Sequence, residues 1–183
     1  RIDGGLHYAD PFRRGDGADG EESEATTGSS RLQWTLGSRL EWEPDERHRI
    51  RVNADYAQLT LEGIDEGAGG ALFDRTQVQE QLRVSGEHRL RGPDGLQLLT
   101  RATYGQFREQ YLNDQRGSNR LDDYEDNREH MGQITSLLRF NAEALGTLTI
   151  TVGFEQLFQS LDSARLTQFA TRARFALLAQ DQW

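Results

Sequence analysis

The chain has 183 residues, a net charge of −9 at neutral pH, 35% hydrophobic residues and no cysteine. The absence of cysteine excludes disulfides and thiolate metal sites. The acidic total, without a basic stripe that carries interleaved aromatics, argues against nucleic acid as a partner. No apolar run approaches the roughly 20 residues of a transmembrane helix. The length fits a single domain over residues 1–183.

Residues 31–61 contain the clearest pattern in the chain. Within residues 31–43 the even positions are apolar except for Ser38, as in Leu32, Trp34 and Leu36, and the positions between them are polar or glycine. This period of two predicts a β-strand with one apolar and one polar face. Residues 49–61 repeat the pattern after the polar turn 44–48. The two segments therefore predict an antiparallel hairpin, with strands longer than the usual five or six residues.

The same unit returns along the chain, and no segment has a helical pattern. Eight strands are expected, at residues 1–8, 31–43, 49–61, 78–91, 96–112, 130–141, 147–159 and 169–183. Short turns are expected at 44–48, 92–95 and 142–146, and longer loops at 9–30, 62–77, 113–129 and 160–168. All short turns would lie at one end of the sheet and all longer loops at the other. Outer-membrane barrels have this asymmetry.

Three features favour lipid as the environment of the apolar face. The strands are long enough to cross a bilayer, no further segment is available to cover the sheet, and the aromatics sort by height. Tyr8, Trp34, Tyr56, Tyr104 and Phe158 fall near the long-loop end, and Trp42, Phe140 and Trp183 fall near the short-turn end. Two lipid-facing girdles around an aliphatic band are expected at the membrane interfaces. The predicted fold is all-β, an antiparallel meander of about eight long strands that forms a segment of a transmembrane β-barrel.

Residues 172–183, with the sequence Arg-Ala-Arg-Phe-Ala-Leu-Leu-Ala-Gln-Asp-Gln-Trp, resemble a recurring barrel segment of TonB-dependent outer-membrane receptors. The turn Pro44-Asp45-Glu46-Arg47-His48 also looks like the periplasmic turns of that family. Gln182 and Leu178 depart from the usual glutamate and aromatic residue. The family has a twenty-two-stranded barrel preceded by a plug domain, whereas eight strands and no plug are expected here. We therefore interpret the chain as a fragment of a longer receptor.

The resemblance implies a place in the bacterial outer membrane and energy-dependent uptake of a scarce ligand, such as a ferric siderophore or a cobalamin. It implies outer-membrane lipid, a small-molecule ligand and the TonB system as partners, the last through a part outside this sequence. Ligand-binding residues are not identified by the sequence. No nucleophile elbow, phosphate loop or catalytic triad stands out, so an enzyme is not expected. Two alternatives stay open: a complete small eight-stranded outer-membrane barrel with a structural or adhesive role, and a soluble β-barrel binding module.

Acidic residues gather in the expected long loops. Loops 9–30, 62–77 and 113–129 together have a net charge of −10, whereas the rest of the chain has +1. In the third loop, Asp122, Asp123, Glu125 and Asp126 offer hard oxygen ligands of the kind that Ca²⁺ prefers. Their spacing is not that of an EF-hand, so solvated acidic loops are the competing interpretation. No other cofactor is expected, and the four histidines lie on different elements without ligand spacing.

Overall fold

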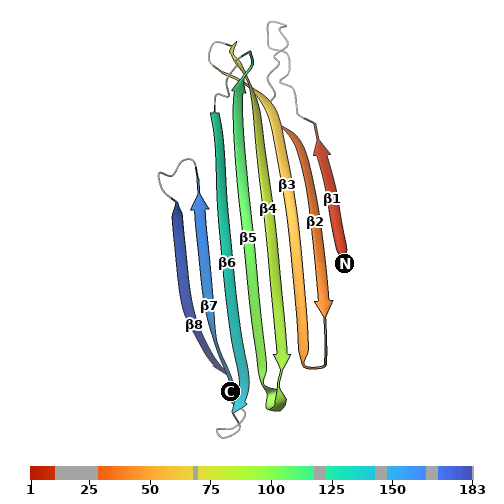
Figure 1. The fold of residues 1–183 in the computed structure, drawn as a ribbon, viewed down its shortest axis with the longest axis vertical. Coiled ribbons are helices and arrows are strands. Elements are labelled where there is room, and N and C mark those ends of the chain that lie inside the picture. The colour runs from red at the N-terminus through yellow and green to blue at the C-terminus, as the bar shows by residue number, and fades with distance from the viewer. Residues whose placement is uncertain (11–28, 68–69, 118–122, 143–147, 164–168, 183) are drawn as a thin grey trace.

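The computed structural model describes residues 1–10, 29–67, 70–117, 123–142, 148–163 and 169–182. Eight antiparallel strands form one sheet in which each strand pairs with its neighbours in the sequence (Figure 1). The prediction of an all-β meander of eight long strands is therefore confirmed. The strands are β1 (Ile2–Ala9), β2 (Ser30–Trp42), β3 (His48–Glu66), β4 (Leu72–Arg91), β5 (Gln97–Gln115), β6 (Asp123–Ala142), β7 (Leu148–Asp162) and β8 (Ala170–Gln182).

The sheet is a single layer, and its register follows the alternation of the sequence. Leu36 lies opposite Tyr56 and Tyr56 lies opposite Leu82, so apolar residues of neighbouring strands share one face. Among the described residues no large side chain is fully buried. Leu36 and Leu40, both on the apolar face, are 51% and 65% exposed. The described sheet thus has no hydrophobic core of its own.

Two short turns close hairpins at one end of the sheet. In the turn between β2 and β3, the Asp45 carboxylate accepts hydrogen bonds from the backbone N–H groups of Arg47 and His48, both at 2.8 Å. A 3-10 helix, η2 (Pro93–Gly95), connects β4 to β5. Gly95 has φ 76°, a left-handed conformation that favours glycine. The third predicted turn, at 142–146, falls almost entirely outside the described residues.

The central strands are longer than the sequence predicts. Expected loop 62–77 is mostly strand, because β3 continues to Glu66 and β4 begins at Leu72. Expected loop 113–129 is corrected in the same way by the end of β5 at Gln115 and the start of β6 at Asp123. In these segments the alternation of apolar and polar residues stops, but the backbone hydrogen bonding between neighbouring strands continues. The reason is that polar side chains pair across the strands there, for example Arg75 with Asp65 at 3.0 Å.

The two edges of the sheet lie far apart. Among the described strands, β1 pairs only with β2 and β8 pairs only with β7, and Figure 1 shows these two at opposite sides of the sheet. Each edge strand carries exposed apolar side chains, such as Leu6 at 71% and Leu177 at 78%. No described helix is both long enough and apolar enough to cross a membrane.

Candidate membrane-facing surface

The apolar face is bounded by aromatic residues at both ends of a band. In β2, Trp34 and Trp42 lie eight residues apart on this face, with Leu36 and Leu40 between them. At about 3.3 Å per residue, the two rings are about 26 Å apart along the strand. Tilted by about 40°, this length projects to about 20 Å, close to the apolar band of about 25 Å that outer-membrane barrels present to lipid.

The aromatics near the long-loop end of the apolar face, here called the upper aromatics, include three that form a line running obliquely across the sheet. Residues directly opposite one another form rows perpendicular to the strands. Trp34 of β2 lies in one row, Tyr56 of β3 in the next row toward the short turns, and Tyr104 of β5 in the row after that. From β2 to β5 the line therefore descends by four residues over three strand spacings. Phe158 of β7 lies in the same row as Tyr104 and does not continue the descent. With about 3.3 Å per residue and about 4.8 Å between strands, this corresponds to an angle of about 43°.

The aromatics near the short-turn end, here called the lower aromatics, descend in the same direction. Trp42 of β2 shares a row with Ser136 of β6, whereas Phe140 lies four residues further along β6. Four residues over four strand spacings correspond to an angle of about 35°. Strands of transmembrane barrels are tilted by roughly 35–45° from the membrane normal. The two aromatic lines thus describe a band to which the strands are inclined as they would be in a barrel wall.

The polar ends of the upper aromatics point to partners level with them or nearer the long loops. Trp34 donates its indole N–H to Gln58 Oε1 at 3.1 Å. Tyr56 donates its hydroxyl hydrogen to Glu80 Oε1 at 3.0 Å. The hydroxyl of Tyr104 lies 2.8 Å from His130 Nδ1. Such rings, with an apolar body and a polar end, are typical of a membrane interface.

Inside the band, polar groups on the apolar face are few, and some satisfy one another. Thr100 and Ser136 lie opposite each other on β5 and β6, and their hydroxyl oxygens are 3.2 Å apart. This mutual hydrogen bond lowers the cost of placing two hydroxyls among apolar side chains. Ser38 on β2, His88 on β4 and Gln156 on β7 are further polar residues on this face of the band.

Above the upper girdle, charged and polar side chains lie among apolar ones on both faces of the central strands. On the face that continues the apolar band, Arg108 donates two hydrogen bonds to the Asp126 carboxylate, at 2.9 and 2.8 Å. Arg128 also contacts Asp126, and Glu80 lies 3.6 Å from Arg108. The paired arginine holds the pKa of Asp126 well below its usual range. This part of the sheet is outside the band and is suited to water.

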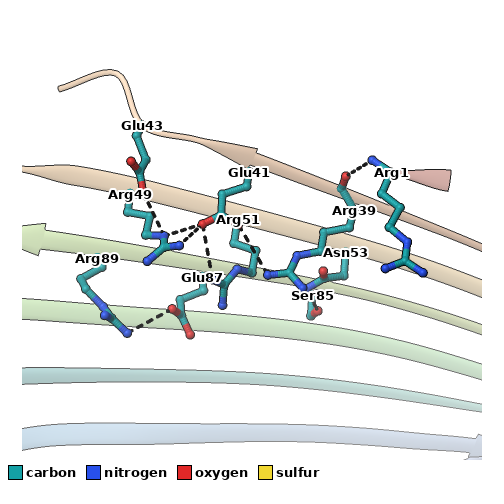
Figure 2. Close-up of polar contacts among 10 residues, drawn as sticks. All are labelled: Arg1, Arg39, Glu41, Glu43, Arg49, Arg51, Asn53, Ser85, Glu87 and Arg89. Carbon is teal, nitrogen blue, oxygen red and sulfur yellow. Dashed lines mark hydrogen bonds and ion pairs between the residues drawn. The ribbon is translucent and has the colours of Figure 1, made fainter. Parts of the chain in front are cut away.

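The other face of the band carries a row of alternating charges. Glu41, Arg51, Glu87 and Arg101 lie side by side on β2 to β5. Arg101 contacts Glu87 at 2.8 Å, and Arg51 contacts Glu41 at 3.4 Å. Figure 2 shows the part of this network around Glu41 and Glu87, with arginines and acids of neighbouring strands pointing toward one another. Cross-strand pairs of this kind stabilise a sheet whose polar face is hydrated.

A hollow of about 680 Å³ opens on the polar face between β1 and β4. Gly5 and Gly37 leave room at its floor, and a Cβ at Gly37 would lie 3.0 Å from Asp55 Oδ1. Arg39 and Arg83 contribute to its lining, together with Asp55. The hollow can receive a polar group that brings both hydrogen-bond donors and acceptors.

The predicted site residues are distributed as follows. Five of the six girdle residues lie on the apolar face as expected: Trp34, Trp42, Tyr56, Tyr104 and Phe140. The sixth, Trp183, lies outside the described residues. Whether these residues face lipid stays a prediction.

The suggested calcium ligands do not all lie together. Asp123 and Glu125 are on one face of β6, whereas Asp126 is on the other and is held by two arginines. Asp122 lies outside the described residues. Among the part that the structure describes, no three acidic or histidine side chains converge in a way that could hold a metal ion. Calcium binding at this loop stays a prediction.

Comparisons with models of protein families and with curated proteins returned no match. The sequence resemblance and the geometry of the sheet are therefore the two supports for a function.

Proposed function

We propose that this chain forms part of the wall of an outer-membrane β-barrel, with its apolar face toward lipid and its charged face toward a lumen. The observation that carries the proposal is the pair of parallel, oblique aromatic lines. Their separation of about 20 Å along the membrane normal and their inclination of about 35–43° both suit a bilayer. A soluble sheet would need a cover for the same face, because exposed apolar patches of this extent are rare in soluble monomers.

The separated edges favour a barrel larger than eight strands. β1 and β8 lie at opposite sides of the described sheet, and their outer backbone groups require partners in hydrocarbon. Further strands would supply these partners in a large barrel. The alternative of a complete eight-stranded barrel requires β1 to pair with β8.

Within this class, we propose a TonB-dependent uptake receptor. The resemblance of residues 172–183 and of the turn 44–48 supports this choice. The hydrated, charged face suits a wide lumen through which a polar ligand passes, and the transport of a scarce ligand such as a ferric siderophore or a cobalamin follows from the family. The role is that of a transporter and not of an enzyme.

Fluorescence quenching by brominated lipids tests the orientation. Single-tryptophan variants that retain Trp34 or Trp42 are folded into vesicles whose lipids carry bromine at one defined depth. Both tryptophans should be quenched most strongly by bromine close to the headgroups. A tryptophan introduced by Val52→Trp should respond most to bromine near the bilayer centre. The matched control is Thr103→Trp on the polar face, for which weak quenching at every depth is expected. Equal quenching of the tryptophans at positions 52 and 103 would contradict the proposed orientation.

Uptake assays test the transport role separately. Cells with and without the gene that encodes this chain are compared for accumulation of a radiolabelled ferric siderophore and of radiolabelled cobalamin. Loss of uptake of one ligand, both on deletion of this gene and on deletion of the TonB gene, is expected. Unchanged uptake of a wide panel of such ligands would refute the receptor role and leave the membrane orientation standing.

A further inference from the structure

Two histidines that are forty residues apart in the sequence meet on the apolar face, near its short-turn end. His48 Nδ1 lies 3.0 Å from His88 Nε2. The two rings are parallel within 3°, and their centroids are 5.3 Å apart. Both residues are half-buried. The spacing of the histidines in the sequence gave no sign of this pair.

The pair is held by the backbone on both sides. His48 lies opposite Leu90 and His88 lies opposite Ile50, so the two histidines are diagonal neighbours on adjacent strands. A diagonal separation is within reach of long or aromatic side chains. Asp45 accepts the backbone N–H of His48 and so fixes the point at which β3 begins. The two imidazoles therefore approach each other from fixed backbone positions, not from mobile loops.

The distance between the nitrogens suits a metal ion that prefers 90° angles. With bonds of about 2.0–2.1 Å, nitrogens 3.0 Å apart subtend about 91–97° at a shared ion. A tetrahedral ion such as Zn²⁺ would require the nitrogens to move to about 3.3–3.4 Å. Square-planar or tetragonal nitrogen sites are typical of Cu²⁺ and Ni²⁺, and Cu²⁺ binds most tightly in the first-row series.

The protonation chemistry is compatible with such an ion. A neutral imidazole carries one N–H, and the other ring nitrogen can act as a ligand. In the hydrogen-bonded pair, one histidine donates the proton between the rings. When a metal binds, that proton moves to the other nitrogen of the same ring, so both facing nitrogens become ligands and no net proton is lost.

We propose that His48 and His88 form a two-imidazole binding site for a divalent transition-metal ion, with Cu²⁺ preferred over Ni²⁺ and Zn²⁺. The remaining positions around the ion are filled by water, because the pair lies at the short-turn boundary of the apolar band, close to the Asp45 turn. Among the described residues no third histidine or acidic side chain joins the pair. The proposal is independent of the transport role, since adjacent strands of the sheet form the site.

Electron paramagnetic resonance of the detergent-solubilised protein with one equivalent of Cu²⁺ tests the proposal. The spectrum should show hyperfine coupling to two equatorial nitrogens at neutral pH. This measurement on the unaltered protein separates the histidine pair from acidic loops, which would supply only oxygen ligands. A spectrum with no nitrogen coupling, or with coupling to a single nitrogen, would overturn the proposal.

Variants give a second test. Substituting a residue that only supports a ligand typically weakens metal binding 10- to 100-fold, so His48→Asn or His88→Asn should weaken Cu²⁺ binding at least about tenfold. The matched control is His130→Asn, which removes the single histidine that contacts Tyr104 on the same face. It should leave Cu²⁺ affinity unchanged. Equal titration curves for the unaltered protein, His48→Asn and His88→Asn would refute the site.

Discussion

A charge placed on the apolar face should destabilise the protein according to its depth. Val52 lies on this face of β3, four residues from Tyr56 at the upper girdle and four from His48 at the lower boundary. At about 3.3 Å per residue and a tilt of about 40°, it is about 10 Å below the upper girdle, which in the proposed orientation is near the bilayer centre. Arginine at the midplane of a barrel costs about 2–4 kcal/mol, so Val52→Arg should be destabilised by this amount.

Leu36→Arg should cost less, because Leu36 lies only two residues from Trp34. Its depth is about 5 Å below the girdle, between the midplane and the interface, where the cost falls to about 0–1 kcal/mol. We therefore expect a value of about 1–2 kcal/mol for Leu36→Arg.

The assay is reversible urea unfolding in phospholipid vesicles, followed by tryptophan fluorescence. A cost of 2–4 kcal/mol corresponds to about a 30- to 900-fold change in the ratio of folded to unfolded protein, well above the error of such measurements. Thr103→Arg on the polar face is the control and should change stability by less than about 0.5 kcal/mol. If Val52→Arg is as stable as Thr103→Arg, the apolar face does not meet hydrocarbon and the proposed orientation fails.

Three further changes probe polar contacts outside the apolar band or at its upper edge. Tyr56→Phe removes the hydrogen bond to Glu80 and should lower the unfolding free energy by about 1 kcal/mol, measured by the same urea titration. Asp126→Asn should weaken protection from hydrogen exchange at the upper ends of β5 and β6, because it removes the charged partner of Arg108. The pKa of Asp126 is lowered in the folded protein, so the ionised carboxylate stabilises the fold at pH values above the usual carboxyl range. This stabilisation is lost as the pH falls through the folded-state pKa. The stabilities of the variant and the parent should therefore converge in strong acid. Asp45→Ala should expose the turn before β3 to limited proteolysis more rapidly than in the parent, and equal cleavage rates would show that the two backbone hydrogen bonds do not hold the turn.

The sequence by itself determined which side chains share a face. Alternation between apolar and polar residues is a local property of each strand, and a strand presents its side chains to opposite sides whatever lies beside it. The hairpins around Pro44 and Gly95 were equally readable, because turn residues act on the backbone next to them. Five of the predicted girdle residues consequently lie on the face to which the pattern assigned them.

Only the tertiary structure decided where the strands end and which residues meet across them. The ladders of β3 to β6 continue through polar sequence because pairs such as Arg75 with Asp65 are made between strands. The register between strands converts separate aromatic positions into two inclined lines. It also brings His48 to His88. Pairing across strands depends on register, which is a relation between segments and is not visible in either segment alone.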